Sequence, residues 1–69
     1  MTMTILIVDD ELKARRNLGD WLSHRGYEVI DAATLQEARA NIARGIADLV
    51  LLDVQLPDGY GLDLLDEFP

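Results

Sequence analysis

Two short aliphatic runs, each followed at once by aspartate, constrain the fold of this chain more than any other feature. The first run, Ile5 to Val8, leads into Asp9 and Asp10, and the second, Leu49 to Leu52, leads into Asp53. Neither run alternates apolar with polar residues, which is typical of strands in a parallel sheet covered on both faces. We therefore expect two parallel strands whose carboxyl ends carry three acidic side chains.

A helical pattern and a further strand follow the first run. Apolar residues recur at i, i+4, i+7 and i+8 and predict a helix with one packed face, made by Ala14, Leu18, Trp21 and Leu22. Gly26 is expected to end this helix. Residues 27–33 are rich in β-formers and predict the next strand.

Two more helices are expected on either side of the second run. A T-x-x-E capping box from Thr34 to Glu37 opens the first of them, and Gly45 ends it. Its inward face is predicted to consist of Leu35, Ala38 and Ile42. After a turn at residues 57–59, a last helical stripe is predicted from Leu62, Leu65 and Phe68.

The resulting order is β-α-β-α-β-α, with no linker, repeat or low-complexity segment. Such alternation predicts an α/β fold with a doubly wound parallel sheet and right-handed crossovers. The strand at residues 49–52 is expected at an open flank, where it lacks the charges and prolines that usually protect a sheet edge. We therefore expect a homo-oligomer formed through this edge or by exchange of elements between copies.

Length and charge narrow the function classes. With 69 residues the chain holds one small domain or part of one. Its net charge is −7 and residues 46–69 contain no Lys or Arg, so we expect no binding to nucleic acid. The apolar runs are too short to span a membrane, and cytoplasmic residence is the default expectation. The absence of cysteine leaves oxygen ligands as the candidates for a metal site.

The acidic residues predict a site for a hard cation. In open α/β sheets, ligands bind beyond the carboxyl ends of the strands, where strand order reverses. Carboxylates of Asp10 and Asp53 on neighbouring strands could share one ion, for which oxygen ligands favour Mg²⁺ or Mn²⁺. A carboxylate beside such an ion can attack a phosphoryl group and give an aspartyl phosphate. Taken alone, Asp9 and Asp10 could equally cap a helix, and Asp53 could belong to a turn.

Together, these segments resemble the receiver domains of two-component response regulators. The resemblance rests on I-L-I-V-D-D-E at residues 5–11 and D-L-V-L-L-D-V-Q-L-P-D-G at residues 48–59, and it covers nearly the whole chain. It implies a flavodoxin-like sheet of strand order 2-1-3, truncated so that the family's fourth and fifth strands are absent. Residues 1–69 would then be a single, incomplete receiver domain.

The resemblance also implies roles for individual residues. Asp53 would accept a phosphoryl group from a sensor histidine kinase or phosphotransfer protein. Asp10 would bind Mg²⁺ directly, Asp9 through water or as a neighbouring acid, and Gln55 through its backbone carbonyl. The chain would be a phosphorelay signalling module and no enzyme.

Two residues that receivers usually carry have no match in this sequence, and two other functions are compatible with it. Receivers carry a Ser or Thr ending the fourth strand and a Lys ending the fifth, and this sequence has no positions to match them, so impaired phosphorylation and switching are expected. One alternative is a Mg²⁺-dependent phosphohydrolase with an Asp nucleophile, although such enzymes usually carry a second Asp where Gln55 stands. The other is a purely structural fragment that dimerises.

Overall fold

The computed structural model describes residues 2–53 and 55–67. Helices and strands alternate along the first part of the chain, in the order β1 (Thr4–Val8), α1 (Leu12–His24), β2 (Glu28–Ala32), α2 (Leu35–Ala43) and β3 (Leu49–Leu52). A small hairpin and a 3-10 helix follow, namely β4 (Gln55–Leu56), β5 (Gly59–Tyr60) and η1 (Gly61–Asp66). None of the helices in these ranges is long and apolar enough to cross a bilayer.

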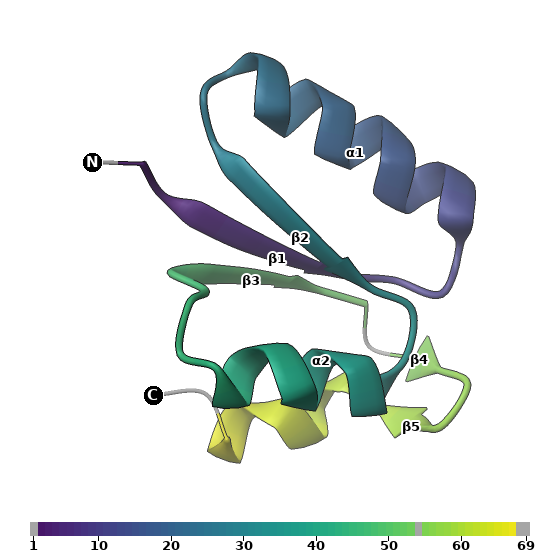
Figure 1. Ribbon diagram of the computed structural model, residues 1–69. Helices are drawn as coiled ribbons and strands as arrows, with labels where there is room; N and C mark the ends of the chain where they lie inside the picture. The colour runs from purple at the N-terminus through teal and green to yellow at the C-terminus, as the bar shows by residue number, and fades with distance from the viewer. Residues whose placement is uncertain (1, 54, 68–69) are drawn as a thin grey trace.

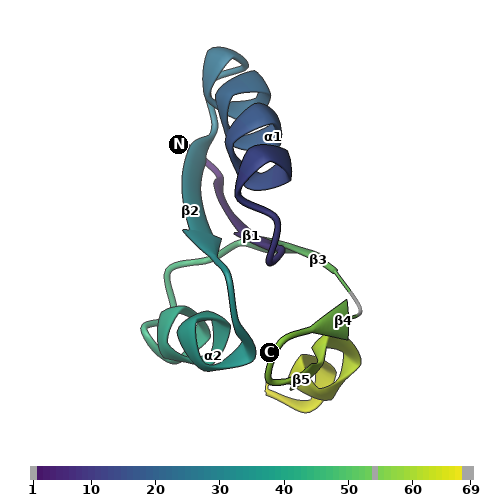
Figure 2. The same ribbon diagram turned by 90° about the vertical axis from the view of Figure 1, so that its right-hand side faces the viewer.

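The three longer strands form a parallel sheet of order β2-β1-β3, as predicted. Ile7 in the central strand pairs with Asp31 on one side and with Leu51 on the other. In Figures 1 and 2, α1 covers one face of the sheet, and α2 and the yellow helix η1 cover the other. The hairpin is a separate antiparallel pair, and its labels β4 and β5 do not denote the family's fourth and fifth strands.

Helices on both faces explain why β1 is apolar from Ile5 to Val8. Its side chains alternate between two cores: Ile5 and Ile7 pack with Leu22 of α1, while Leu6 and Val8 pack on the side of α2. All four strand residues are buried. The second core is the larger one, and its other buried members are Ala32, Leu35, Ala38, Ile42, Leu56 and Leu64.

The helix boundaries follow the predicted signals. Gly26 and Gly45 have φ of 92° and 71°, a left-handed conformation that favours glycine after a helix. The backbone N–H of Glu37 donates to Thr34 Oγ1 at 3.1 Å. The Glu37 carboxylate reaches back to the amide of Ala33 at 3.2 Å, which closes the capping box one residue earlier than the standard pattern.

The predicted inward face of α1 is correct in part: Leu22 is buried as predicted, but Leu18 and Trp21 are exposed. Trp21 is 53% exposed, and its ring lies under the Arg25 guanidinium, whose carbon is 4.1 Å from the ring centroid. The face that packs on the sheet instead runs through Arg15, Gly19 and Leu22. Arg15 can lie there because its guanidinium has hydrogen-bond partners, and Gly19 faces Val29 at ordinary contact distance.

The last predicted stripe is also wrong. Residues 61–66 form a 3-10 helix, in which positions three apart share a face, so Gly61 and Leu64 are buried together. Leu62 and Leu65, predicted as core, are 54% and 66% exposed. Phe68, the third member of that stripe, lies outside the described residues.

Candidate functional site

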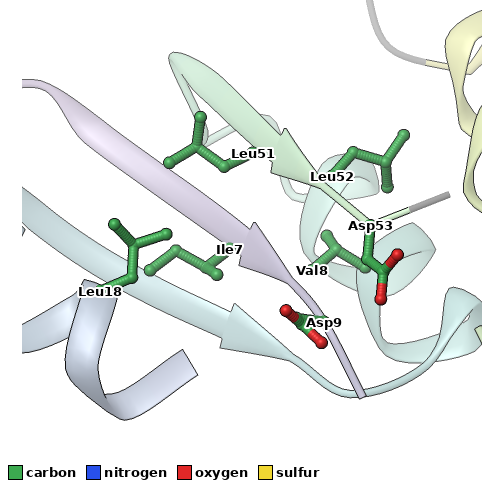
Figure 3. Close-up of a pocket in the computed structure, with 7 residues that line it drawn as sticks. All are labelled: Ile7, Val8, Asp9, Leu18, Leu51, Leu52 and Asp53. Carbon is green, nitrogen blue, oxygen red and sulfur yellow. The ribbon is translucent and has the colours of Figure 1, made fainter. Parts of the chain in front are cut away.

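The acidic residues predicted from the sequence come together at the carboxyl ends of β1 and β3. Each of Asp9, Asp10 and Asp53 offers a carboxylate oxygen, and these oxygens lie within 4.8 Å of one another. Asp9 and Asp53 are half-buried and Asp10 is exposed. Figure 3 shows Asp9 and Asp53 at the ends of adjacent strands. Three neighbouring carboxylates repel one another, so the arrangement favours binding of a cation.

The sheet itself fixes where these side chains start. The backbone N–H of Asp9 donates to the Ala32 carbonyl at 3.1 Å, and that of Asp53 donates to the Val8 carbonyl at 2.8 Å. Each aspartate therefore continues the hydrogen-bond ladder by one position. The parallel register, and not a flexible loop, brings the two carboxylates together.

Hydrogen bonds to both the backbone and the side chain of Asp9 fix the segment after β1. Arg15 Nη1 donates to the Asp9 carbonyl at 2.8 Å, and Arg15 Nε pairs with Asp31 Oδ2 at 3.1 Å. The backbone N–H of Glu11 donates to Asp9 Oδ1 at 3.0 Å. Asp9 Oδ2 is not used in these contacts and remains able to face a cation. Sequence reasoning missed Arg15, whose place on the packed face of α1 gave no apolar signal.

The Asp53 side chain is similarly constrained at one oxygen. The backbone N–H of Gln55 donates to Asp53 Oδ1 at 3.3 Å, and this long hydrogen bond orients the carboxylate without engaging Oδ2. Close packing also limits the segment that follows. A Cβ built on Gly61 would lie 2.2 Å from the Asp53 carbonyl oxygen, so glycine is required for this approach.

A pocket of about 340 Å³ opens beside the acidic cluster. Asp9 and Asp53 line its polar end, and the remaining lining residues are aliphatic: Ile7, Val8, Leu18, Leu51 and Leu52. Figure 3 shows the two carboxylates at the strand ends and Leu18 projecting from α1. The pocket thus places the carboxylates of Asp9 and Asp53 beside an apolar surface.

Asp58, in the turn between β4 and β5, makes a contact that the sequence did not reveal. Its carboxylate accepts hydrogen bonds from the backbone N–H groups of Leu35, at 2.8 Å, and Gln36, at 3.0 Å. The hydrogen bond from Leu35 is the main cause of a lowered pKa of Asp58, and the one from Gln36 adds to it. Desolvation acts in the opposite direction, but the pKa stays below its ordinary value. The only signal in the sequence was a turn, which does not specify a distant partner.

With this geometry established, comparison with known proteins decides the family. The sequence model of the family described as "Response regulator receiver domain" matches residues 5–69. The chain belongs to this receiver family. Its members are signalling modules of two-component systems, and the order β2-β1-β3 matches their flavodoxin-like fold.

Curated relatives of this receiver are transcriptional regulators. It is 44% identical over 61 residues to the phosphate regulon regulatory protein PhoB of Pseudomonas aeruginosa, covering 88% of this chain and 27% of the relative. It is 41% identical over 61 residues to the KDP operon regulatory protein KdpE of Escherichia coli, with the same two coverages. The receiver therefore spans about a quarter of these relatives.

Solved receiver structures superpose well on the described fold. The response regulator TrrA of Thermotoga maritima, in complex with Mg(2+)-BeF, gives a TM-score of 0.88 at 38% identity, covering 96% of this chain and 57% of that one. The non-phosphorylated HemR receiver domain of Leptospira biflexa gives 0.89 at 36% identity, covering 96% and 53%. The chain spans about half the length of these solved domains.

Proposed function

We propose that this receiver accepts a phosphoryl group on Asp53 from a phosphohistidine of a sensor kinase or phosphotransfer protein, with Mg²⁺ held beside it. The observation that carries the proposal is the convergence of Asp9, Asp10 and Asp53 at the ends of two parallel strands. The Mg(2+)-BeF complex of the Thermotoga relative supports the choice of metal.

The donor set fits Mg²⁺. Carboxylate and carbonyl oxygens are the ligands that this ion prefers, and opposite ligands of one octahedral Mg²⁺ are separated by about 4 Å. Oxygens within 4.8 Å of one another are therefore suited to one ion, directly or through one water molecule. Asp10 and Asp53 would bind it directly, Asp9 through water, and Gln55 by its backbone carbonyl. The bound ion would neutralise charge on the phosphoryl oxygens.

The residues of the chain then perform the transfer by orientation. Asp53 Oδ2 forms a bond to phosphorus while the bond from phosphorus to the donor imidazole nitrogen breaks. The bonding electron pair stays on that nitrogen, which takes up a proton from solvent, and Asp53 becomes an acyl phosphate. The Gln55 amide on Oδ1 keeps the attacking oxygen directed outward.

Mass spectrometry of the intact chain tests this proposal. With Mg²⁺ and acetyl phosphate, wild type should gain one phosphoryl group and Asp53→Asn none, while Asp63→Asn, an exposed acid in η1, serves as the matched control. Equal labelling of wild type and Asp53→Asn would overturn the assignment of Asp53.

The proposed function also implies how much of a receiver domain the chain contains, which kind of protein it is and where in the cell it acts. Residues 1–69 would form a single, incomplete receiver domain, a signalling module without catalytic turnover, in the cytoplasm with its kinase. A partner contact to nucleic acid through this chain is not expected, given its charge of −7. The phosphohydrolase alternative is not favoured, because Gln55 stands where a second catalytic acid is needed.

Self-association is a second proposal, supported by the outer edge of β3. β3 pairs with β1 alone among the strands of the described residues. Beside it lies an apolar pocket of about 180 Å³, lined by Ile42, Leu49, Val50, Leu52, Leu64 and Leu65. An unpaired strand edge next to apolar surface suits a strand from a second copy of this chain.

Light scattering over a range of protein concentrations tests this association. Leu49 is 42% exposed on the β3 edge, so Leu49→Lys should shift the chain toward monomer by placing charge in the interface. Leu62→Lys is the control, since Leu62 is 54% exposed and does not line the pocket. A wild type that stays monomeric at millimolar concentration would exclude the proposal.

A further inference from the structure

At the N-terminus of α2, the backbone N–H groups of the first four residues all have acceptors, which two different residues provide. The amides of Glu37 and Ala38 donate to the Oγ1 and carbonyl oxygen of Thr34, at 3.1 Å and 3.0 Å. The first two amides, those of Leu35 and Gln36, donate to the carboxylate of Asp58. Thr34 is a local cap, whereas Asp58 comes from a turn beyond β3.

Close packing accompanies these two hydrogen bonds. A Cβ built on Gly59 would lie 2.7 Å from Leu35 Cδ1, and φ of Gly59 is 149°, so only glycine permits this contact. Leu56, at the other side of the turn, is buried in the core that also contains Leu35. The β4–β5 hairpin therefore contacts the first turn of α2 in two ways: the Asp58 carboxylate accepts hydrogen bonds from it, and Gly59 packs against Leu35.

The other end of the same hairpin adjoins the acidic cluster. Gln55 opens β4, pairs with Tyr60 of β5, and donates its amide to Asp53 Oδ1. Gly61, which follows β5, packs against the Asp53 carbonyl. The β4–β5 hairpin thus contacts the N-terminus of α2 at one end and Asp53 at the other.

We propose that Asp58 is a positioning residue for the cation site, acting by fixing the β4–β5 hairpin and with it the backbone carbonyl of Gln55. This inference rests on the proposed function, in which that carbonyl is a ligand. Residues that orient ligands from outside a metal site commonly change metal affinity on the order of tenfold or more. Linkage is reciprocal, so Mg²⁺ binding must also strengthen the Asp58 contacts to Leu35 and Gln36.

Thr34→Ala provides a matched control for Asp58. Both substitutions remove caps from the same helix terminus, but Thr34 makes no hydrogen bond to the hairpin. In calorimetric Mg²⁺ titrations of the full chain, Asp58→Ala should lose on the order of tenfold in affinity. Thr34→Ala should bind as wild type does, and Asp58→Asn, which keeps a carbonyl acceptor, should fall between them.

Amide NMR spectra supply the second readout. Mg²⁺ should move the Leu35 and Gln36 resonances in wild type and in Thr34→Ala, but not in Asp58→Ala. Equal Mg²⁺ affinities in all variants would overturn the positioning role and leave Asp53 chemistry intact. If wild type binds no Mg²⁺, the proposed function fails. Spectra recorded without metal then test the positioning role alone. Asp53 and Gln55 amide resonances that are the same in Asp58→Ala as in wild type would overturn this inference too.

Discussion

Arg15 reaches across from α1 to donate a hydrogen bond to the backbone carbonyl of Asp9 at 2.8 Å. Its side chain is 12% exposed, and its second partner is Asp31. The positively charged Arg15 side chain thus lies on the sheet-facing side of α1 and contacts the backbone of Asp9, a member of the acidic cluster. These two partners explain how a helix can bury an arginine on its packed face.

Replacing Arg15 with Met should leave the Asp9 carbonyl without its partner. We expect a loss of about 1–3 kcal/mol in the free energy of unfolding, the usual cost of an unsatisfied, partly buried polar group. Urea denaturation followed by circular dichroism measures this loss. Arg16→Met is the control because Arg16 is exposed, and an equal effect of both substitutions would contradict the prediction.

Removing charge from the acidic cluster should change how stability responds to Mg²⁺. Asp53→Asn relieves repulsion, so we expect a higher melting temperature than wild type without metal. Mg²⁺ at ten times its dissociation constant should stabilise wild type by about 1.4 kcal/mol and Asp53→Asn by less. Thermal melts with and without Mg²⁺ measure both effects. Asp66→Asn, outside the cluster, should behave as wild type.

Stability should fall in acid partly through Asp58. The pKa of Asp58 is lower in the folded chain than its ordinary value of 3.8, so its contribution is complete above that value. The contribution disappears as pH falls through the lowered pKa, because protonation removes the charge that accepts the α2 amides. The stability difference between wild type and Asp58→Asn, from urea titrations, should be constant above about pH 5 and shrink below pH 4. A difference that grows in acid would contradict this sign.

Two glycine substitutions should have opposite effects. Gly61→Ala would bring a Cβ against the Asp53 carbonyl, and we expect a loss of about 1–3 kcal/mol. Gly19→Ala meets only an ordinary contact, 3.5 Å from Val29 Cγ1, and should stabilise α1 by roughly 0.5–1 kcal/mol. Chemical denaturation of both variants tests the pair. A tolerated Gly61→Ala would show that the hairpin is not closely seated on Asp53.

Local signals predicted the strands, the capping box and the helix ends because each depends on residues close in sequence. The acidic cluster was also predictable, since parallel strands that end in aspartate must bring those residues to one edge. These inferences needed no knowledge of side-chain partners.

The errors arose where a distant partner decides the structure. Trp21 looked like a core residue by spacing, but it is exposed, while Arg15 lies on the packed face and donates hydrogen bonds to Asp31 and to the Asp9 carbonyl. The capping role of Asp58 was invisible because its partners precede it by more than twenty residues. Periodicity cannot reveal a tertiary contact of this kind.

The uneven division of the core has a consequence for motion. Among the described residues, the layer under α1 buries Ile5, Ile7 and Leu22, far fewer than the opposite layer. Sub-global opening should therefore release α1 first, while α2 and the hairpin remain folded. Because Asp10 lies two residues before α1 whereas Asp53 follows β3, such opening should loosen the Asp10 side of the acidic cluster more than the Asp53 side.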